Sequence, residues 1–231
     1  MKKPTVDYRH LRPSTLTSPE YRHLLWLLGW VGYFILYFLT ENLIPVSRCY
    51  SVHSLLDDRI PFFEWFVIPY VGWYLLIVVS LLYFALYNPE NFKNLQKYII
   101  ITQAVAMACY ILFPTRQDLR PIEFPRENFL TDILQVIYTF DTNTGVCPSL
   151  HVAYSLGIVS TWLREKSASG TIKSVVVVFA LSVCLSVVFV KQHSVIDVYA
   201  ALPVCLLAEF LVFIYPRLLI KRKSTNQESP S

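Results

Sequence analysis

Residues 191–216, KQHSVIDVYAALPVCLLAEFLVFIYP, form a long apolar run that opens with a lysine, a histidine and an aspartate. An apolar helix of about 17–25 residues is long enough to cross the hydrocarbon core of a bilayer. The apolar part of this stretch, 194–215, is one of six such blocks; the others lie at approximately 24–40, 66–87, 98–114, 149–164 and 174–190. The sequence therefore predicts an all-α, polytopic membrane protein, a bundle of six transmembrane helices.

The composition supports this class of protein. Of 231 residues, 55% are apolar and 16% are charged, against about 25% charged in ordinary soluble domains. Too little polar surface remains for a soluble globule, so we expect one membrane catalytic domain at 24–216. It follows a cytoplasmic segment at 1–23 and precedes a basic, disordered tail at 217–231. The first block lacks a small-residue cleavage site and is expected to be a retained helix.

The basic residues predict the orientation of the six helices. With six spans, 14 of the 20 basic residues fall on one side of the membrane, and basic loops stay in the cytoplasm. Both termini are therefore expected to be cytoplasmic. The net charge of +4 needs no nucleic-acid partner, because the basic residues cluster as topology signals do. These residues are Lys2, Lys3, Arg9, Arg12, Arg22, Lys93, Lys97, Arg164, Lys166, Lys173, Arg217, Lys221, Arg222 and Lys223.

Most of the chemically notable residues fall on the other, outer side. The loop that joins the third and fourth spans contains apolar residues at helical spacing, which predicts a short amphipathic helix in the membrane interface. These are Phe129, Ile133, Val136, Ile137 and Phe140. The loop ends in CPSLH (147–151), and the next outer segment is KQHSVID (191–197).

His193 and Asp197 are four residues apart and so share one face of a helix. An aspartate in this position can accept the Nδ1–H of the imidazole, which leaves a free lone pair on Nε2. This is the base and orienting acid of a nucleophilic site. In CPSLH, Pro148 suits the first turn of a helix, so the fourth span starts there. Its free N–H groups, the Ser149 hydroxyl and His151 would suit an anion.

Three cations complete the expected site. Arg116 and Arg120 lie four residues apart in the second outer loop, and Lys191 stands just before His193. They could neutralise the oxygens of a phosphoryl group, whose transfer depends mainly on positioning and charge stabilisation. The residues thus point to phosphoryl transfer at the membrane surface.

These motifs resemble those of the type-2 phosphatidic acid phosphatase superfamily. Arg120-Pro121 matches its Arg-Pro motif, Pro148-Ser149-Leu150-His151 its Pro-Ser-Gly-His motif, and His193 with Asp197 its third motif. The likeness covers roughly residues 60–215. Three positions differ: Phe113 replaces the family lysine, Val187 the arginine, and Leu150 the glycine. With Lys-Gln-His and DDRIPF, the variant looks more like the inositol phosphorylceramide synthase branch.

The resemblance implies a mechanism without metal or cofactor. His193 would attack phosphorus and become a phosphohistidine, oriented by Asp197. His151 would protonate the leaving group and then activate water or an alcohol. Ser149, Arg120 and Lys191 would hold the phosphate oxygens, with Arg116 in a weaker role. The substrate would be a lipid phosphate or phosphodiester. Hydrolysis and transfer of a phospho-headgroup to an alcohol acceptor both fit, because they share the phosphohistidine step.

Other interpretations of these residues stay open. Arg116, Arg120 and Lys191 could anchor lipid headgroups. His151, His193 and Asp197 could bind zinc. The chain could also be a non-catalytic lipid-binding or transport protein.

Four further residues are ambiguous. Asp57 and Asp58 fit a polar turn better than an acceptor site, and Glu209 fits a structural hydrogen bond. Cys49 and Cys147 both fall on the outer side, where a disulfide is one option.

Overall fold

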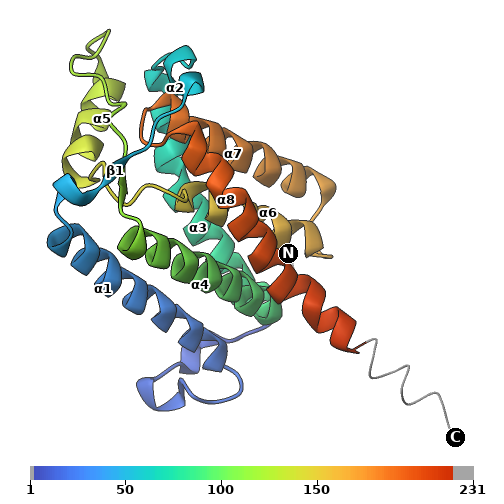
Figure 1. The fold of residues 1–231 in the computed structure, drawn as a ribbon. Coiled ribbons are helices and arrows are strands. Elements are labelled where there is room, and N and C mark those ends of the chain that lie inside the picture. The colour runs from blue at the N-terminus through green and yellow to red at the C-terminus, as the bar shows by residue number, and fades with distance from the viewer. Residues whose placement is uncertain (1–2, 221–231) are drawn as a thin grey trace, which may run out of the picture.

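In a computed structural model, which describes residues 3–220, the chain is a helical bundle (Figure 1). The all-α prediction is confirmed. The long helices are α1 (Leu28–Leu43), α3 (Val67–Tyr87), α4 (Pro89–Leu112), α6 (Leu150–Arg164), α7 (Gly170–Phe189) and α8 (Val195–Glu209).

Short elements connect these helices. They are the 3-10 segments η1 (Tyr8–His10), η2 (Pro13–Thr15), η3 (Arg22–Leu27), η4 (Val46–Arg48) and η5 (Glu64–Phe66), the helices α2 (Leu55–Arg59) and α5 (Phe129–Phe140), the π-helical η6 (Phe210–Ile214), and the strands β1 (Tyr50–Ser51) and β2 (Thr115–Arg116). β1 and β2 pair in parallel, with Tyr50 opposite Thr115.

Five helical stretches are long and apolar enough to cross a membrane: Arg22–Leu43, Glu64–Tyr87, Pro89–Leu112, Gly170–Phe189 and Val195–Ile220. They match five of the six expected spans and indicate a multi-pass membrane protein. The remaining block forms α6, which has 15 residues. At 1.5 Å per residue it is about 22 Å long, less than the roughly 30 Å of a hydrocarbon core. That α6 spans the membrane stays a prediction.

The short α6 is the most enclosed helix of the bundle. It packs against α3, α4, α7 and α8, and Ile158 and Tyr154 in it are almost fully buried. Gly157 allows the close approach to α4, because a Cβ at this position would lie 2.5 Å from Cδ1 of Tyr98. The residues that begin α6 are therefore held firmly relative to the other helices.

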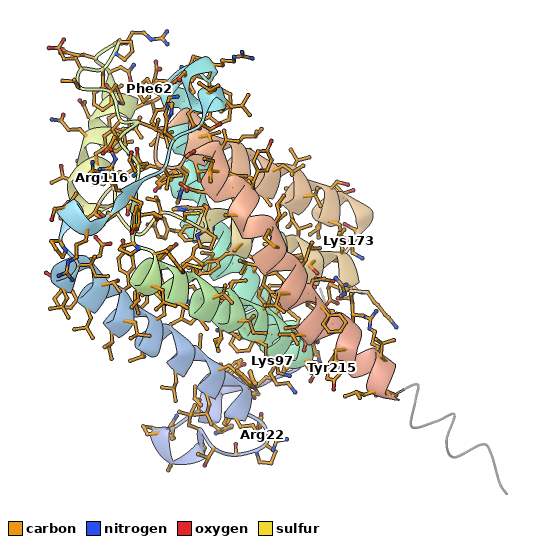
Figure 2. The ribbon with its side chains drawn as sticks, viewed as in Figure 1. Arg22, Phe62, Lys97, Arg116, Lys173 and Tyr215 are labelled. Atoms are coloured by element: carbon orange, nitrogen blue, oxygen red, sulfur yellow. The ribbon has the colours of Figure 1, made fainter. Side chains whose placement is uncertain are left out.

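The two ends of the bundle differ in character. The short elements α2, β1, β2 and α5 gather at one end, and Figure 2 shows Phe62 and Arg116 there, with Arg22, Lys97, Lys173 and Tyr215 toward the other. Thr5 donates its N–H to the carbonyl of Leu86 at the C-terminal end of α3. The first and last described residues therefore lie at the same end of the bundle, the one with Arg22 and Tyr215 (Figure 2). This agrees with the predicted topology, although the compartment that each end faces stays a prediction.

The amphipathic helix expected in the second outer loop forms as α5. It packs through the buried Leu134, while Phe129 and Phe140 are 74% and 84% exposed. Its placement in the membrane interface stays a prediction.

Further expectations meet different outcomes. Glu209 does make structural bonds, since Arg164 pairs with it and Ser160 donates to it at 2.5 Å. Cys49 and Cys147 are free thiols, so no disulfide joins them. The predicted disordered end of the tail, 221–231, lies outside the described residues.

Candidate active site

His193 and Asp197 form the expected pair at the start of α8. Nδ1 of His193 lies 3.1 Å from Oδ2 of Asp197, and both side chains are buried. Because an ionised carboxylate only accepts hydrogen bonds, Nδ1 carries the proton and Nε2 keeps the lone pair. Asp197 holds its position by also accepting the backbone N–H of Ser194 at 3.0 Å. Asp197 thus lies in the first turn of α8, whereas His193 precedes the N-cap, Ser194, and is not part of the helix.

The turn before α8 aims His193 at the site. Lys191 adopts a left-handed conformation with φ of +55°, and the N–H groups of Gln192 and His193 both donate to the carbonyl of Val187. This ends α7 within one turn, as left-handed residues commonly do at helix C-termini. Because glycine usually occupies such a position, a lysine at residue 191 does not indicate this turn.

Asp57 also fixes the start of α8. Its side chain is 2% exposed and accepts from the Ser194 hydroxyl at 2.6 Å and from the Val195 N–H at 2.8 Å. It also caps its own helix, α2, by accepting the N–H of Ser54 at 2.8 Å. Asp57 therefore has a structural role, as expected, but it is a buried cap shared by two helices and not part of an exposed polar turn. Asp58, by contrast, is exposed and contacts His53.

The second histidine lies beside the first. The ring centroids of His151 and His193 are 5.6 Å apart, and His151 packs between Tyr70 at 4.7 Å and Trp73 at 4.1 Å. Nε2 of His151, Oγ of Ser149 and Oδ1 of Asp197 are buried and have no hydrogen-bond partner among residues 3–220. Buried polar atoms are rarely left unpaired. Of these three residues, His151 lines the cavity described next, whereas Ser149 and Asp197 do not.

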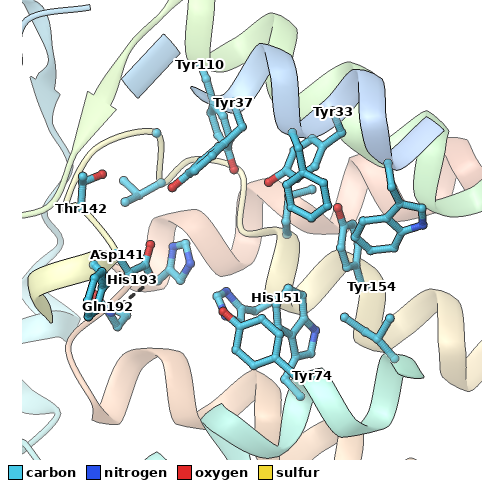
Figure 3. Close-up of a pocket in the computed structure, with 18 of the residues that line it drawn as sticks. Tyr33, Tyr37, Tyr74, Tyr110, Asp141, Thr142, His151, Tyr154, Gln192 and His193 are labelled. Carbon is cyan, nitrogen blue, oxygen red and sulfur yellow. Dashed lines mark hydrogen bonds between the residues drawn. The ribbon is translucent and has the colours of Figure 1, made fainter. Parts of the chain in front are cut away.

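A cavity of about 600 Å³ opens onto the two histidines. Its wall near them also includes Asp141 and Gln192. Figure 3 shows Tyr33 and Tyr37 on one side of this cavity, with Tyr74 and His151 across from them. Aromatic and aliphatic side chains form most of the remaining wall: Leu27, Trp30, Tyr33, Phe34, Tyr37, Trp73, Tyr74, Ile77, Val78, Leu81, Tyr110, Phe140, Leu150 and Tyr154. The cavity therefore combines a polar end with a long apolar chamber.

Arg120 lies at the edge of the site, but its guanidinium is already hydrogen-bonded to other residues of the protein. It donates to Oε1 of Gln192 and to the carbonyl oxygens of Tyr138, Asp141 and Thr142, at 2.6–3.1 Å. It also lies 4.6 Å from the ring centroid of Tyr138, and its partial burial lowers its pKa. Arg120 thus fastens the 138–142 segment to the turn before α8, and its role in phosphate binding stays a prediction.

Lys191 and Arg116 point to other parts of the protein. The Lys191 ammonium donates to the carbonyl oxygens of Asp57 and Ile60, at 2.8 and 2.6 Å, and so binds the C-terminal turn of α2. Burial lowers its pKa. Arg116 lies in β2 and pairs with Asp118 at 3.1 Å. Neither side chain lines the cavity, and their assignment to phosphate also stays a prediction.

Sequence reasoning missed Asp141 and Gln192. The Asp141 carboxylate accepts from the Tyr70 hydroxyl at 2.9 Å and from the Gln192 amide at 3.3 Å. Tyr70 in turn stacks on His151, so this polar group adjoins both histidines. Asp141 follows α5 directly, and its place in the site depends on how that helix returns to the bundle, which no motif indicates.

Cys147 is a further neighbour of the pair. Burial, together with the nearby Asp197 carboxylate, raises the pKa of its thiol to about 12. The zinc alternative finds no support in the donor geometry: within the described range, no three His, Cys, Asp or Glu side chains converge as a metal site.

Comparison with known proteins adds no family to these observations. No protein-family model, curated protein or solved structure matches this chain.

Proposed function

We propose that this chain is an integral membrane phosphoryl-transfer enzyme that removes the phosphate of a lipid through a phosphohistidine at His193. Nε2 of His193 attacks phosphorus as the bond to the lipid oxygen breaks, and His151 gives that oxygen a proton. Water then attacks phosphorus, the P–N bond breaks, and His151 takes the proton of the water. Asp197 stabilises the positive charge that the ring carries in between.

One observation carries this proposal: a histidine oriented by a buried aspartate shares one cavity with a second histidine. In neutral imidazole the free nitrogen is a nucleophile, and the second histidine is within reach as proton carrier. The Ser149 hydroxyl, just before α6, has no partner among the described residues and is a further candidate donor for a phosphate oxygen, although Ser149 is buried and does not line the cavity. The dipole of α6 favours an anion at the same point.

The apolar chamber supports a lipid as the substrate. Ligand pockets of about 300–1,000 Å³ bind molecules whose surface they largely enclose, and here most of the wall is aromatic or aliphatic. The phosphate would meet the histidines while a hydrocarbon chain lies along α1 and α3. In the expected orientation this reaction occurs on the non-cytoplasmic side.

A second candidate is transfer of a phospho-headgroup to an alcohol. The polar end of the cavity holds Asp141, Thr142, Thr144 and Gln192, which could bind the hydroxyl groups of an acceptor. Because Arg120 and Lys191 are held by carbonyl groups of the protein, little free positive charge faces the site. A phosphodiester, which carries one negative charge, would need less compensation than a monoester.

The test follows the phosphorus atom. Purified protein in mixed micelles with a chelator receives lipid phosphates and phosphodiesters labelled on phosphorus, with and without alcohol acceptors. Release of labelled phosphate by the wild type indicates a phosphatase, and label in a new lipid indicates a transferase. His193→Ala should abolish either product and the acid-labile phosphoenzyme. His53→Ala, in an exposed loop histidine, serves as the control. Equal turnover by wild type and His193→Ala would refute the proposal.

A further inference from the structure

A second cavity lies between η3, the start of α1 and α4, far from the histidines. It measures about 470 Å³, and Arg22, Trp26, Gly29, Lys93 and Ile100 contribute to its wall. Arg22 and Lys93 come from different elements, so the fold brings them together. Nothing in the candidate active site uses these residues.

The charge of this cavity is positive. Arg22 is exposed, and its guanidinium makes no hydrogen bond to any residue that the structure describes. Lys93 pairs with Glu90 on the surface of α4, and the Lys97 ammonium lies 5.5 Å from the centre of the Trp26 ring. Arg22 and Lys93 both line the cavity, no Asp or Glu of the described residues does, and Glu90 pairs with Lys93 alone, so the wall carries an excess of positive charge.

The position of the cavity along α4 fits a membrane interface. Lys93 lies near the start of α4, and Tyr110, beside the candidate site, lies near its end. They are 17 positions apart, which corresponds to about 25 Å at 1.5 Å per residue, close to the roughly 30 Å of a hydrocarbon core. Figure 2 shows Arg22 and Lys97 at the end of the bundle away from Arg116. The second cavity therefore belongs to the opposite membrane surface.

Apolar contacts continue from the cations toward the membrane interior. Trp26 is 37% exposed, as tryptophan at the headgroup level commonly is. Below it, α1 meets α4 at Gly29, where a Cβ would lie 2.6 Å from Cδ1 of Ile100. An amphiphile could place its charged head between Arg22 and Lys93 and its chain on this apolar wall.

We propose that this cavity binds the phosphorylated headgroup of an anionic phospholipid from the leaflet opposite the candidate active site. Basic pockets between membrane helices bind such headgroups. A zwitterionic lipid with no net charge should bind more weakly, because its own ammonium group would be repelled by Arg22 and Lys93. Binding here is independent of phosphoryl transfer and persists in His193→Ala.

The test measures quenching of Trp26 fluorescence. Protein is reconstituted in phosphatidylcholine vesicles that contain an equal fraction of either brominated phosphatidylglycerol or brominated phosphatidylcholine. The wild type should be quenched more strongly by the anionic lipid, and Trp26→Phe should lose this excess. Arg22→Glu/Lys93→Glu should lose it as well. Lys166→Glu/Lys173→Glu, with the same change of charge at the same end of the bundle, should keep it.

Three outcomes would overturn the site. They are equal quenching by both lipids in the wild type, an excess that survives Arg22→Glu/Lys93→Glu, or an excess lost to the same degree in Lys166→Glu/Lys173→Glu. The last would mean that only the general positive field attracts the lipid. Relief of the excess by inorganic phosphate would instead assign the cavity to a soluble anion. Circular dichroism and thermal unfolding of each variant show whether it is folded.

Discussion

The backbone N–H of Ser149 donates a hydrogen bond to the carbonyl oxygen of Asp197 at 3.1 Å. This bond joins the N-cap of α6, the helix that carries His151, to the first turn of α8, which His193 directly precedes. The bond couples the two helix starts, so the 5.6 Å between the two rings depends on how α6 and α8 pack. The relative position of the two histidines is therefore linked to this one hydrogen bond between the helix starts.

Asp197→Asn tests the charge of the orienting group. One oxygen of Asp197 accepts both from His193 and from Ser194, and an asparagine can keep both bonds through its carbonyl oxygen. It loses only the negative charge that stabilises the phosphohistidine. We expect kcat to fall by roughly two to three orders of magnitude with little change of the thermal unfolding midpoint. Asp197→Ala should lower both kcat and the thermal unfolding midpoint, because it also leaves the Ser194 N–H unpaired. Wild-type kcat in Asp197→Asn would contradict the role of the charge.

Asp57→Ala tests the shared helix cap. The substitution leaves two N–H groups and a hydroxyl without their acceptor, and buried groups of this kind cost about 1–3 kcal/mol each when unpaired. We expect the free energy of unfolding to fall by about 2–4 kcal/mol, measured by denaturation in micelles. Activity should fall too, since the start of α8 loosens. The exposed neighbour is the matched control, and Asp58→Ala should change neither quantity. Similar effects in both variants would mean that the cap does not matter.

How far the sequence predicts this structure depends on the range of the interactions. Apolar length is a local property, and five of the six expected spans have the required length and hydropathy. The pairing of His193 with Asp197 was also predictable from their spacing of four, but the expected shared helical face was wrong, because His193 precedes Ser194, the N-cap of α8. The helical repeat of 129–140 likewise gave the bounds of α5.

The remaining contacts join segments far apart in the chain. Asp57 reaches Ser194 across 137 positions, Lys191 reaches Asp57 across 134, and Arg120 reaches Gln192 across 72. The residue type alone does not show whether Lys191 binds phosphate or the end of a helix, because its ammonium group would donate hydrogen bonds in both cases. Only the packing of α2 against the turn before α8 shows which carbonyl groups are near.

Arg120→Lys separates a positioning role from phosphate binding. Lysine keeps the charge but cannot reproduce the planar fork that reaches Gln192 and three carbonyl groups. We expect the free energy of unfolding to fall by about 1–3 kcal/mol, and kcat to fall as the 138–142 segment becomes mobile. Arg116→Lys, in a solvent-exposed pair worth at most about 1 kcal/mol, is the control. A higher KM for the phosphorylated substrate with unchanged stability would instead indicate that Arg120 binds phosphate.

Labelling of Cys147 reports directly on the charge of Asp197. Because burial and this carboxylate raise the thiol pKa to about 12, roughly one thiol in ten thousand is ionised at pH 8, against about a quarter of free cysteines with a pKa near 8.5. Maleimide labelling, followed residue by residue with mass spectrometry, should therefore be slow at Cys147 and rise with pH up to the pKa. Asp197→Asn removes the nearby negative charge but leaves Cys147 buried. The pH midpoint of Cys147 labelling should therefore move down and still lie above that of a free thiol.

Cys49 is the internal control for this experiment. Burial is the main cause that raises its pKa, and Asp197 is not among the others, so its profile should be the same in both proteins. A Cys147 midpoint near 8.5 in Asp197→Asn would mean that the variant opens the site to solvent. An unchanged Cys147 midpoint would mean that the Asp197 carboxylate is not ionised beside it, and the charge assigned to the His193–Asp197 pair would then be wrong.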